Sequence, residues 1–158
     1  NTEWCYLLGD FGVRVTGRSK VITALPDKLA FDKLETQGLP FYGGNVTYHL
    51  EVEANGALSV TATNYYGALI GVSVDGADNG RIIYPPYTLL AEDIGSGTHK
   101  VDITLYGHRF NAFGAVHLTD NRHSWHGPDA WRSEGCRWSY EYTLRPVGII
   151  ASPVIKVK

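Results

Sequence analysis

The chain has 158 residues, of which 44% are hydrophobic and 19% are charged, a composition that suits a single folded domain with a substantial core. Its formal net charge is −2, and its 14 Lys and Arg residues are scattered along the sequence. Nucleic-acid-binding surfaces usually carry clustered Lys and Arg, so we expect no nucleic-acid partner. No apolar run approaches the roughly 20 residues that a membrane-spanning helix needs, so we expect no membrane partner.

The N-terminal third contains few strand signals. Val13 and Val15 predict a first strand. Residues 27–37 have leucines and a phenylalanine at tolerable helical spacing, followed by Gly38. These residues are expected to form a short helix or an ordered loop that ends at Gly38.

Alternating apolar and polar residues predict a hairpin after residue 45. In the segment 46–53 the even-numbered residues are apolar and the odd-numbered ones are polar. Asn55 and Gly56 follow as a turn pair, and residues 58–62 alternate again. This pattern is typical of two half-buried strands joined by a tight turn.

Further alternating segments continue to the C-terminus. We expect strands at 70–74, 80–84, 101–106, 137–144 and 154–157, with turns at Asp75-Gly76, Pro85-Pro86 and Gly95-Ser96-Gly97. The aromatic stripe of Trp138, Tyr140 and Tyr142 is predicted to pack in the core. Strands spaced by roughly ten residues indicate an all-β fold, either a sandwich or a barrel. Residues 20–44 and 111–135 remain as long segments, which are usually functional or docked against the body of a domain.

The stretch from Gly67 to Arg109 resembles the sugar-binding, jelly-roll domain of family-2 glycoside hydrolases. The matching parts are residues 72–76, Gly80, Pro86-Tyr87, Glu92-Asp93-Ile94 and residues 97–105. The resemblance implies an antiparallel β-sandwich of the jelly-roll, galactose-binding-like kind.

Residues 38–48 and 111–117 also resemble C-terminal domains of large bacterial glycoside-hydrolase-like proteins. This resemblance implies one domain over residues 1–158, with a partly irregular segment 1–44 and a jelly-roll body at 45–158. It also implies an accessory domain beside the catalytic domain of the same parent chain, in a bacterial protein that is either secreted or cytoplasmic. The chain starts at Asn1 and contains no Met, which fits the expectation of an excised domain.

The segment 117–138 is the richest in residues suited to binding a sugar. Sugars have apolar C–H faces and hydroxyl edges, so a site needs flat aromatic rings beside planar polar groups. The predicted ligand-binding residues are Trp125 and Trp131 as platforms, with His117, Asn121, Asp129 and Arg132 as polar partners. The alternative is a loop that folds back on the sandwich and buries its own tryptophans.

The sequence leaves open whether the chain binds a metal ion and whether its two cysteines form a disulfide. His117, His123 and His126 match no zinc spacing. Asp75, Asp78 and Asn79 could hold a structural calcium, although they lack the order of an EF-hand. We expect no other cofactor. Cys5 and Cys136 are either two thiols or one disulfide between the first and last strands.

Catalytic patterns are weak throughout. Glu51 and Glu53 share a face that is expected to be exposed, and Glu134 and Glu141 are only loose candidates for a glycosidase carboxylate pair. Ser124, His117 and Asp120 lack the nucleophile elbow of a triad hydrolase. The sequence therefore predicts a non-catalytic carbohydrate-binding or accessory domain of a larger glycoside hydrolase. The alternatives are a structural interdomain module and a small glycoside hydrolase using loop carboxylates.

Overall fold

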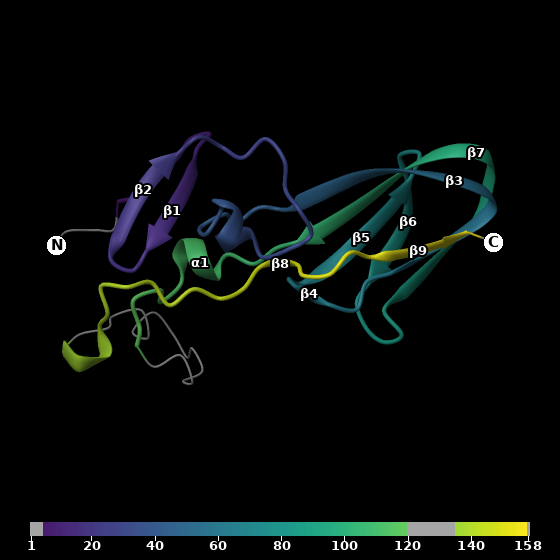
Figure 1. The fold of residues 1–158 in the computed structure, drawn as a ribbon. Coiled ribbons are helices and arrows are strands. Elements are labelled where there is room, and N and C mark those ends of the chain that lie inside the picture. Colours follow the sequence, from purple (N-terminus) through teal and green to yellow (C-terminus); the bar gives the residue numbers. More distant parts are fainter. Residues whose placement is uncertain (1–4, 120–134, 158) are drawn as a thin grey trace.

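The computed structural model describes residues 5–119 and 135–157. It is built mainly from strands, with only short helical turns (Figure 1). The strands are β1 (Gly12–Thr16), β2 (Ser19–Thr23), β3 (Val46–Thr61), β4 (Tyr65–Tyr66), β5 (Leu69–Val74), β6 (Ala77–Ile82), β7 (Thr88–Tyr106), β8 (Gly148–Ile149) and β9 (Val154–Val157). The helical turns are η1 (Leu34–Gln37), α1 (Phe110–Phe113) and η3 (Gly135–Arg137). The predicted all-β class is confirmed.

The largest sheet has five strands in the order β6-β5-β7-β3-β9, and every neighbouring pair is antiparallel. Along β3 the alternation predicted from the sequence holds: Val46, Tyr48 and Val60 are buried, whereas His49 and Glu51 are exposed. One face of the sheet is therefore apolar and the other polar, as expected where one face meets solvent.

The predicted hairpin at Asn55-Gly56 is wrong. Both halves belong to the one strand β3, and its register against β7 shifts between Asn55 and Gly56 and again between Gly56 and Leu58. Gly56 has a φ of 89°, a conformation that glycine adopts without steric cost. The turn signal therefore marks a bulge, which bends a strand instead of ending it. Another predicted turn, Gly95-Ser96-Gly97, is wrong as well, since it lies opposite this bulge inside β7.

The long strands β3 and β7 curl at this bulge, at the end of the molecule where β9 finishes (Figure 1). The buried residues stay on one face of the sheet along the whole length of both strands. A sheet that is apolar on one continuous face can cover that face by folding over on itself. The result is an all-β sandwich with one core, whose fully buried side chains include Leu34, Leu58, Val60, Ile70, Val72, Val101, Ile103, Leu105 and Ile149.

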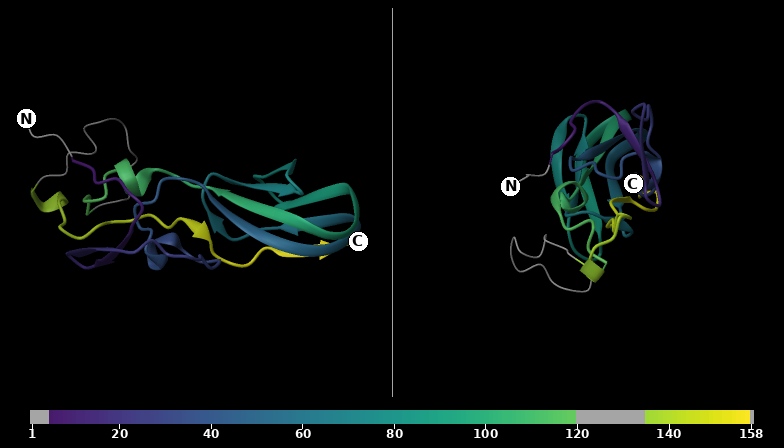
Figure 2. Two further views of the ribbon diagram at one scale, coloured as in Figure 1. Left: turned by 90° about the horizontal axis from the view of Figure 1, so that it is seen from above. Right: turned by 90° about the vertical axis from the view of Figure 1, so that its left-hand side faces the viewer.

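The opposite end of the elongated molecule carries the β1–β2 hairpin, η1, α1 and η3 (Figure 2). Only Leu34–Gln37 of the predicted helical segment forms a helical turn. Gly38 ends it with a φ of 86°, as the sequence predicted. The side chain of Leu34 is buried in the core, and its amide donates to the carbonyl of Val147 at 2.8 Å. This pair of contacts ties the N-terminal segment to the C-terminal one.

A buried asparagine fastens the segment before β8. Asn111, in α1, donates through Nδ2 to the carbonyl of Arg145 at 2.8 Å, and its Oδ1 accepts from the Arg145 amide at 2.8 Å. The Arg145 guanidinium also lies 3.9 Å above the ring of Phe110. Both polar ends of the buried amide are thus satisfied by one residue, as a buried polar group requires.

Candidate carbohydrate-binding site

Five aromatic rings meet where residues 115–119 and 138–142 run beside each other. We call Phe41, His117, Trp138, Tyr140 and Tyr142 the aromatic cluster. The His117 ring stacks on Trp138 with 4.2 Å between centroids, and it lies 4.7 Å from Tyr142. Phe41 meets Tyr142 edge to face at 4.8 Å, and Tyr140 meets Trp138 in the same way at 6.4 Å. Such offset and edge-on contacts are the favourable geometries for aromatic pairs.

Backbone pairing sets the position of these rings. The Ser139 amide donates to the His117 carbonyl at 2.9 Å, and the Thr143 amide donates to the carbonyl of Val116 at 2.7 Å. His117 Nδ1 lies 2.7 Å from the Ser139 carbonyl oxygen. Because a carbonyl only accepts, Nδ1 carries a proton in this contact.

Two basic side chains of the β1–β2 hairpin reach the aromatic cluster. The Arg18 guanidinium lies 4.1 Å above the Tyr140 ring, and Lys20 Nζ lies 4.6 Å from the centroid of the Tyr142 ring. Lys20 Nζ also donates to the Tyr140 carbonyl at 3.2 Å. Both side chains are exposed. These are cation–π contacts, in which a cation meets the negative face of a ring.

The aromatic cluster is partly open to solvent. The side chain of Tyr140 is 60% exposed, whereas Trp138, His117 and Tyr142 are half-buried. The predicted strand at 137–144 is wrong, because only Trp138 forms a β-bridge, to Leu118, and residues 140–144 pair with no strand. The prediction that Trp138, Tyr140 and Tyr142 pack in the core is therefore also wrong. None of the three belongs to the core of the sandwich, and Trp138 packs against Tyr140 instead.

Of the predicted ligand-binding residues, the structure places His117 in the aromatic cluster. Asn121, Trp125, Asp129, Trp131 and Arg132 lie outside the described residues and stay predictions. The sequence did not single out Arg18, Lys20 or Phe41. No local pattern could have found them, because they come from segments far from residue 117 in the chain.

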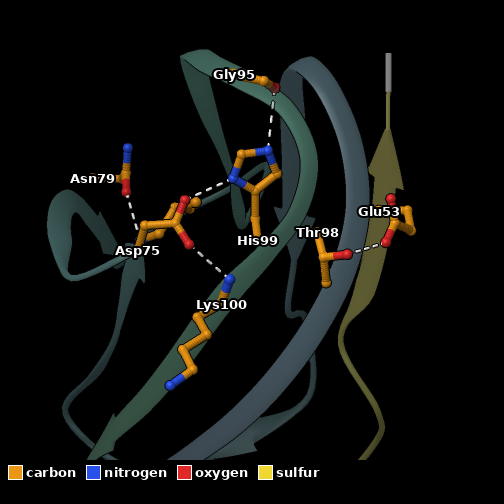
Figure 3. A network of polar contacts seen from close by, with 8 residues as sticks. Glu53, Asp75, Asn79, Gly95, Thr98, His99 and Lys100 are labelled. Carbon is orange, nitrogen blue, oxygen red and sulfur yellow. Dashed lines mark hydrogen bonds and ion pairs between the residues drawn. The ribbon is translucent and has the colours of Figure 1, made fainter.

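A group of polar residues, separate from the aromatic cluster, surrounds the turn between β5 and β6 (Figure 3). Asp75 has a φ of 50°, and its Oδ1 accepts from the Lys100 amide at 2.8 Å while its Oδ2 lies 2.6 Å from His99 Nδ1. The Asn79 Oδ1 accepts from the amide of Val74 at 2.9 Å, and His99 Nε2 lies 3.1 Å from the Gly95 carbonyl. The hydrogen bond to His99 and that to the Lys100 amide lower the pKa of Asp75.

The oxygens proposed for calcium take part in these internal contacts. Asp78 Oδ1 accepts from the Arg81 guanidinium at 2.5 Å and from the Gly80 amide at 3.0 Å, and these hydrogen bonds, that from Arg81 first, lower the pKa of Asp78. Within residues 5–119 and 135–157, no group of three or more His, Cys, Asp or Glu side chains is arranged to hold a metal ion. The turn is held by its own hydrogen bonds.

The outer face of the sheet carries the glutamates considered for catalysis. Glu51 and Glu53 are exposed on β3, and the Thr98 hydroxyl donates to Glu53. A shallow depression of about 400 Å³ beside them is lined by His49, Leu50, Glu51, Lys100 and Asp102. His49 Nδ1 and Asp102 Oδ1 are 2.7 Å apart at its edge. Glu141 is exposed at the other end of the molecule and Glu134 lies outside the described residues.

Cys136 is a free, exposed thiol, so the disulfide alternative for Cys5 and Cys136 is wrong. The part of the chain that the structure describes contains no helix long and apolar enough to cross a bilayer.

Comparison with known proteins finds similarity to solved structures. The rhamnosidase from Novosphingobium sp. PP1Y matches 92% of this chain at 19% identity, with a TM-score of 0.55. The chain is similar to one part of a glycoside hydrolase. It spans 14% of the length of that rhamnosidase. No family model and no curated protein matches the sequence.

Two structures of a GH2 β-galacturonidase from Eisenbergiella tayi also match. One, with bound glycerol, covers 70% of this chain and 19% of its own at 23% identity, with a TM-score of 0.44. The other, with bound galacturonate, covers 60% of this chain and 17% of its own at 22% identity, with a TM-score of 0.40. At these identities the likeness to the rhamnosidase bears on the fold alone, and it agrees with the β-sandwich described above.

Proposed function

We propose that this chain is a non-catalytic domain of a larger glycoside hydrolase and that it binds carbohydrate at the aromatic cluster. The jelly-roll, galactose-binding-like topology and the place beside a catalytic domain of the same parent chain are parts of this proposal. The main support is the aromatic cluster itself. It presents the exposed ring of Tyr140 beside Trp138, with polar groups within a few ångströms.

Sugar rings stack on aromatic faces through their C–H groups, and their hydroxyls need planar donors and acceptors nearby. Arg18 and Lys20 supply hydrogen-bond donors around the rings, and His117 supplies a planar imidazole. In the sequence, the predicted residues at 121–132 lie between Gly135 and Thr119, whose amide donates to the Arg137 carbonyl. Trp125 and Trp131 therefore remain candidate platforms of the same site.

A glycan array followed by titration calorimetry with the purified chain tests this function. Tyr140→Ala is expected to weaken binding of the best array glycan about tenfold or more, because it removes the exposed ring. Tyr84→Ala is the matched control, since Tyr84 is 74% exposed in the loop after β6 and belongs to no ring contact among the described residues. Trp125→Ala and Trp131→Ala test the sequence-predicted platforms. A chain that binds no glycan on the array or in affinity gels would refute the binding role.

A second candidate function is a structural module that docks on the neighbouring domain of its parent chain. It is favoured by exposed apolar residues of the N-terminal part: Leu7, Leu8, Val21, Ile22 and Leu25. Leu8 is 86% exposed. Contiguous exposed apolar surface is typical of interaction sites, and a rhamnosidase about seven times longer than its matched part provides such a context.

The parent protein tests this alternative. Leu8→Ser with Ile22→Ser should lower its melting temperature if these residues are covered by the neighbouring domain, while Ile83→Ser, at an exposed position on the sandwich, should not. Unchanged melting in both variants would rule out docking at this surface.

A further inference from the structure

We propose that the glycan bound at the aromatic cluster is acidic and that Arg18 and Lys20 bind the carboxylate of a uronic-acid residue. This inference rests on the proposed carbohydrate-binding function and names the class of sugar. It is carried by two cations that lie on aromatic rings at the cluster, with no anion bound to either among the described residues.

The two cations lack carboxylate partners within residues 5–119 and 135–157. The ion pairs of this part of the chain join His49 with Asp102, Arg81 with Asp78 and His99 with Asp75. None of them includes Arg18 or Lys20. A cation without a nearby carboxylate leaves its charge available to an anionic ligand.

The hydrogen-bond donors of both cations are also largely unused. The Arg18 guanidinium lies 4.1 Å from the centroid of the Tyr140 ring, and it makes no hydrogen bond to a described residue. Its planar fork of five N–H groups suits a carboxylate, which it can bind through two parallel hydrogen bonds. Lys20 uses one of its three donors, on the Tyr140 carbonyl.

The ring contacts prepare these cations for binding. A side chain held against a ring loses less conformational freedom when a ligand arrives than one that moves freely in solvent. The same rings offer stacking surface for the sugar that carries the carboxylate. Charge recognition and stacking would therefore act on one sugar residue.

One acidic group lies close to this place. A Cβ placed on Gly17 would lie 3.6 Å from Glu141 Oε1, so the Glu141 carboxylate lies beside the turn formed by Gly17 and Arg18. It forms no ion pair within 4.0 Å with Arg18 or Lys20. Its charge should weaken the binding of an acidic sugar, which makes Glu141 a useful position for a test.

The experiment compares an oligogalacturonide or oligoglucuronide with its methyl-esterified form by calorimetry at low and high NaCl concentration. The acid is expected to bind about tenfold more tightly than the ester at low salt, and the difference should shrink as salt screens the charges. In the double variant Arg18→Gln with Lys20→Gln, the acid should bind only as well as the ester. Glu141→Gln should tighten binding of the acid severalfold and leave binding of the ester unchanged.

Arg81→Gln is the matched control, because Arg81 is paired with Asp78 on the sandwich. This variant should keep the full preference for the acid, and circular dichroism should show that every variant is folded. Equal binding of acid and ester would overturn the inference, as would a preference that survives the double variant or tighter binding of a sulfated oligosaccharide that contains no uronic acid. If neither acid nor ester nor any array glycan binds, the carbohydrate-binding function itself fails.

Discussion

The His99 imidazole is held against the Asp75 carboxylate, with 2.6 Å between Nδ1 and Oδ2. On its other side, Nε2 faces the Gly95 carbonyl at 3.1 Å. Both partners are acceptors, so both ring nitrogens must carry a proton for both hydrogen bonds to form. His99 is only 7% exposed. The turn between β5 and β6 is therefore joined to the curled part of β7 through an imidazolium ion.

The stability of the domain should consequently depend on pH through this pair. The hydrogen bond to Asp75 raises the pKa of His99 above its ordinary value of 6.5, against the opposing effect of burial, and Glu53 is the other carboxylate that acts on it. A raised pKa gives stability that is fully present below pH 6.5 and is lost as pH rises through the folded-state value. The lowered pKa of Asp75 acts in the other direction, with stability lost as pH falls below its ordinary value of 3.8.

Melting temperatures measured from pH 5 to pH 9 test this relationship. The wild-type chain should lose stability across the upper part of that range, and His99→Gln should flatten this dependence. His49→Gln is the control, because the His49–Asp102 pair is similar in distance but its histidine side chain is 76% exposed and contributes little. Identical pH profiles for the wild type and His99→Gln would contradict the assignment of an imidazolium.

Gly148 is expected to tolerate no side chain. Its φ is 151°, and a Cβ at this position would collide with the carbonyl of Asp32 in the neighbouring segment. Gly148→Ala should therefore destabilise the domain by about 2 kcal/mol or more, as measured by urea unfolding. Gly95→Ala meets nothing within 4 Å and should change stability by less than about 0.5 kcal/mol. Equal effects of the two substitutions would show that the close approach to Asp32 is not a constraint.

Asn111→Ala should lower the free energy of unfolding by about 2–3 kcal/mol, because it removes two hydrogen bonds and leaves the amide and carbonyl of Arg145 without these partners. Asn111→Asp keeps the acceptor but loses the donor, so it should also destabilise the domain. Asn45→Ala is the control, since the Asn45 side chain is exposed and makes no hydrogen bond to a described residue. Urea unfolding measures all three, and a neutral Asn111→Ala would disprove the role of this contact.

Leu34→Ala tests whether residues 1–158 form one domain, as predicted from the sequence. Leu34 lies in the N-terminal segment, yet its side chain is 1% exposed and packs in the core of the sandwich. Leu34→Ala should lower the free energy of unfolding by about 2–5 kcal/mol, and the whole chain should still unfold in one cooperative transition, at a lower temperature. Leu25→Ala, at a half-exposed position of the same segment, should cost less than about 1 kcal/mol. Two separate transitions in calorimetry would show that the N-terminal segment unfolds independently.

Local patterns predicted the strands well wherever apolar and polar residues alternate in step with the buried and exposed positions of the strand. Val46–Glu53, Ile70–Val74, Val101–Leu105 and the last strand all lie in strands of the structure. The same signals misled where glycine marks a bulge, because a tight hairpin turn and a glycine bulge can both use a positive φ and look alike in a single sequence. Residues 138–144 alternate like a strand, but 140–144 form no strand, and their backbone contact with residues 115–119 is the single hydrogen bond from the Thr143 amide to the Val116 carbonyl.

The candidate site was predicted less completely than the fold. His117 was chosen for its place in a segment rich in aromatic and polar residues, and it does contact Trp138 and Tyr142. Arg18 and Lys20 come from a hairpin about 100 residues away in the chain, and nothing in their own neighbourhood announces the contact. Arrangements that join distant segments through side chains have no signature in local periodicity.

Strands β3 and β7 each run through both halves of the sandwich, with β9 on one flank and β5 on the other. Neither half can therefore detach while the other keeps its backbone partners, because the same two strands supply both. Amide protons on either side of Gly56 should exchange with solvent together, in whole-molecule openings. A domain built in this way can hold its two end surfaces in fixed positions relative to each other, even when a force acts on one of them.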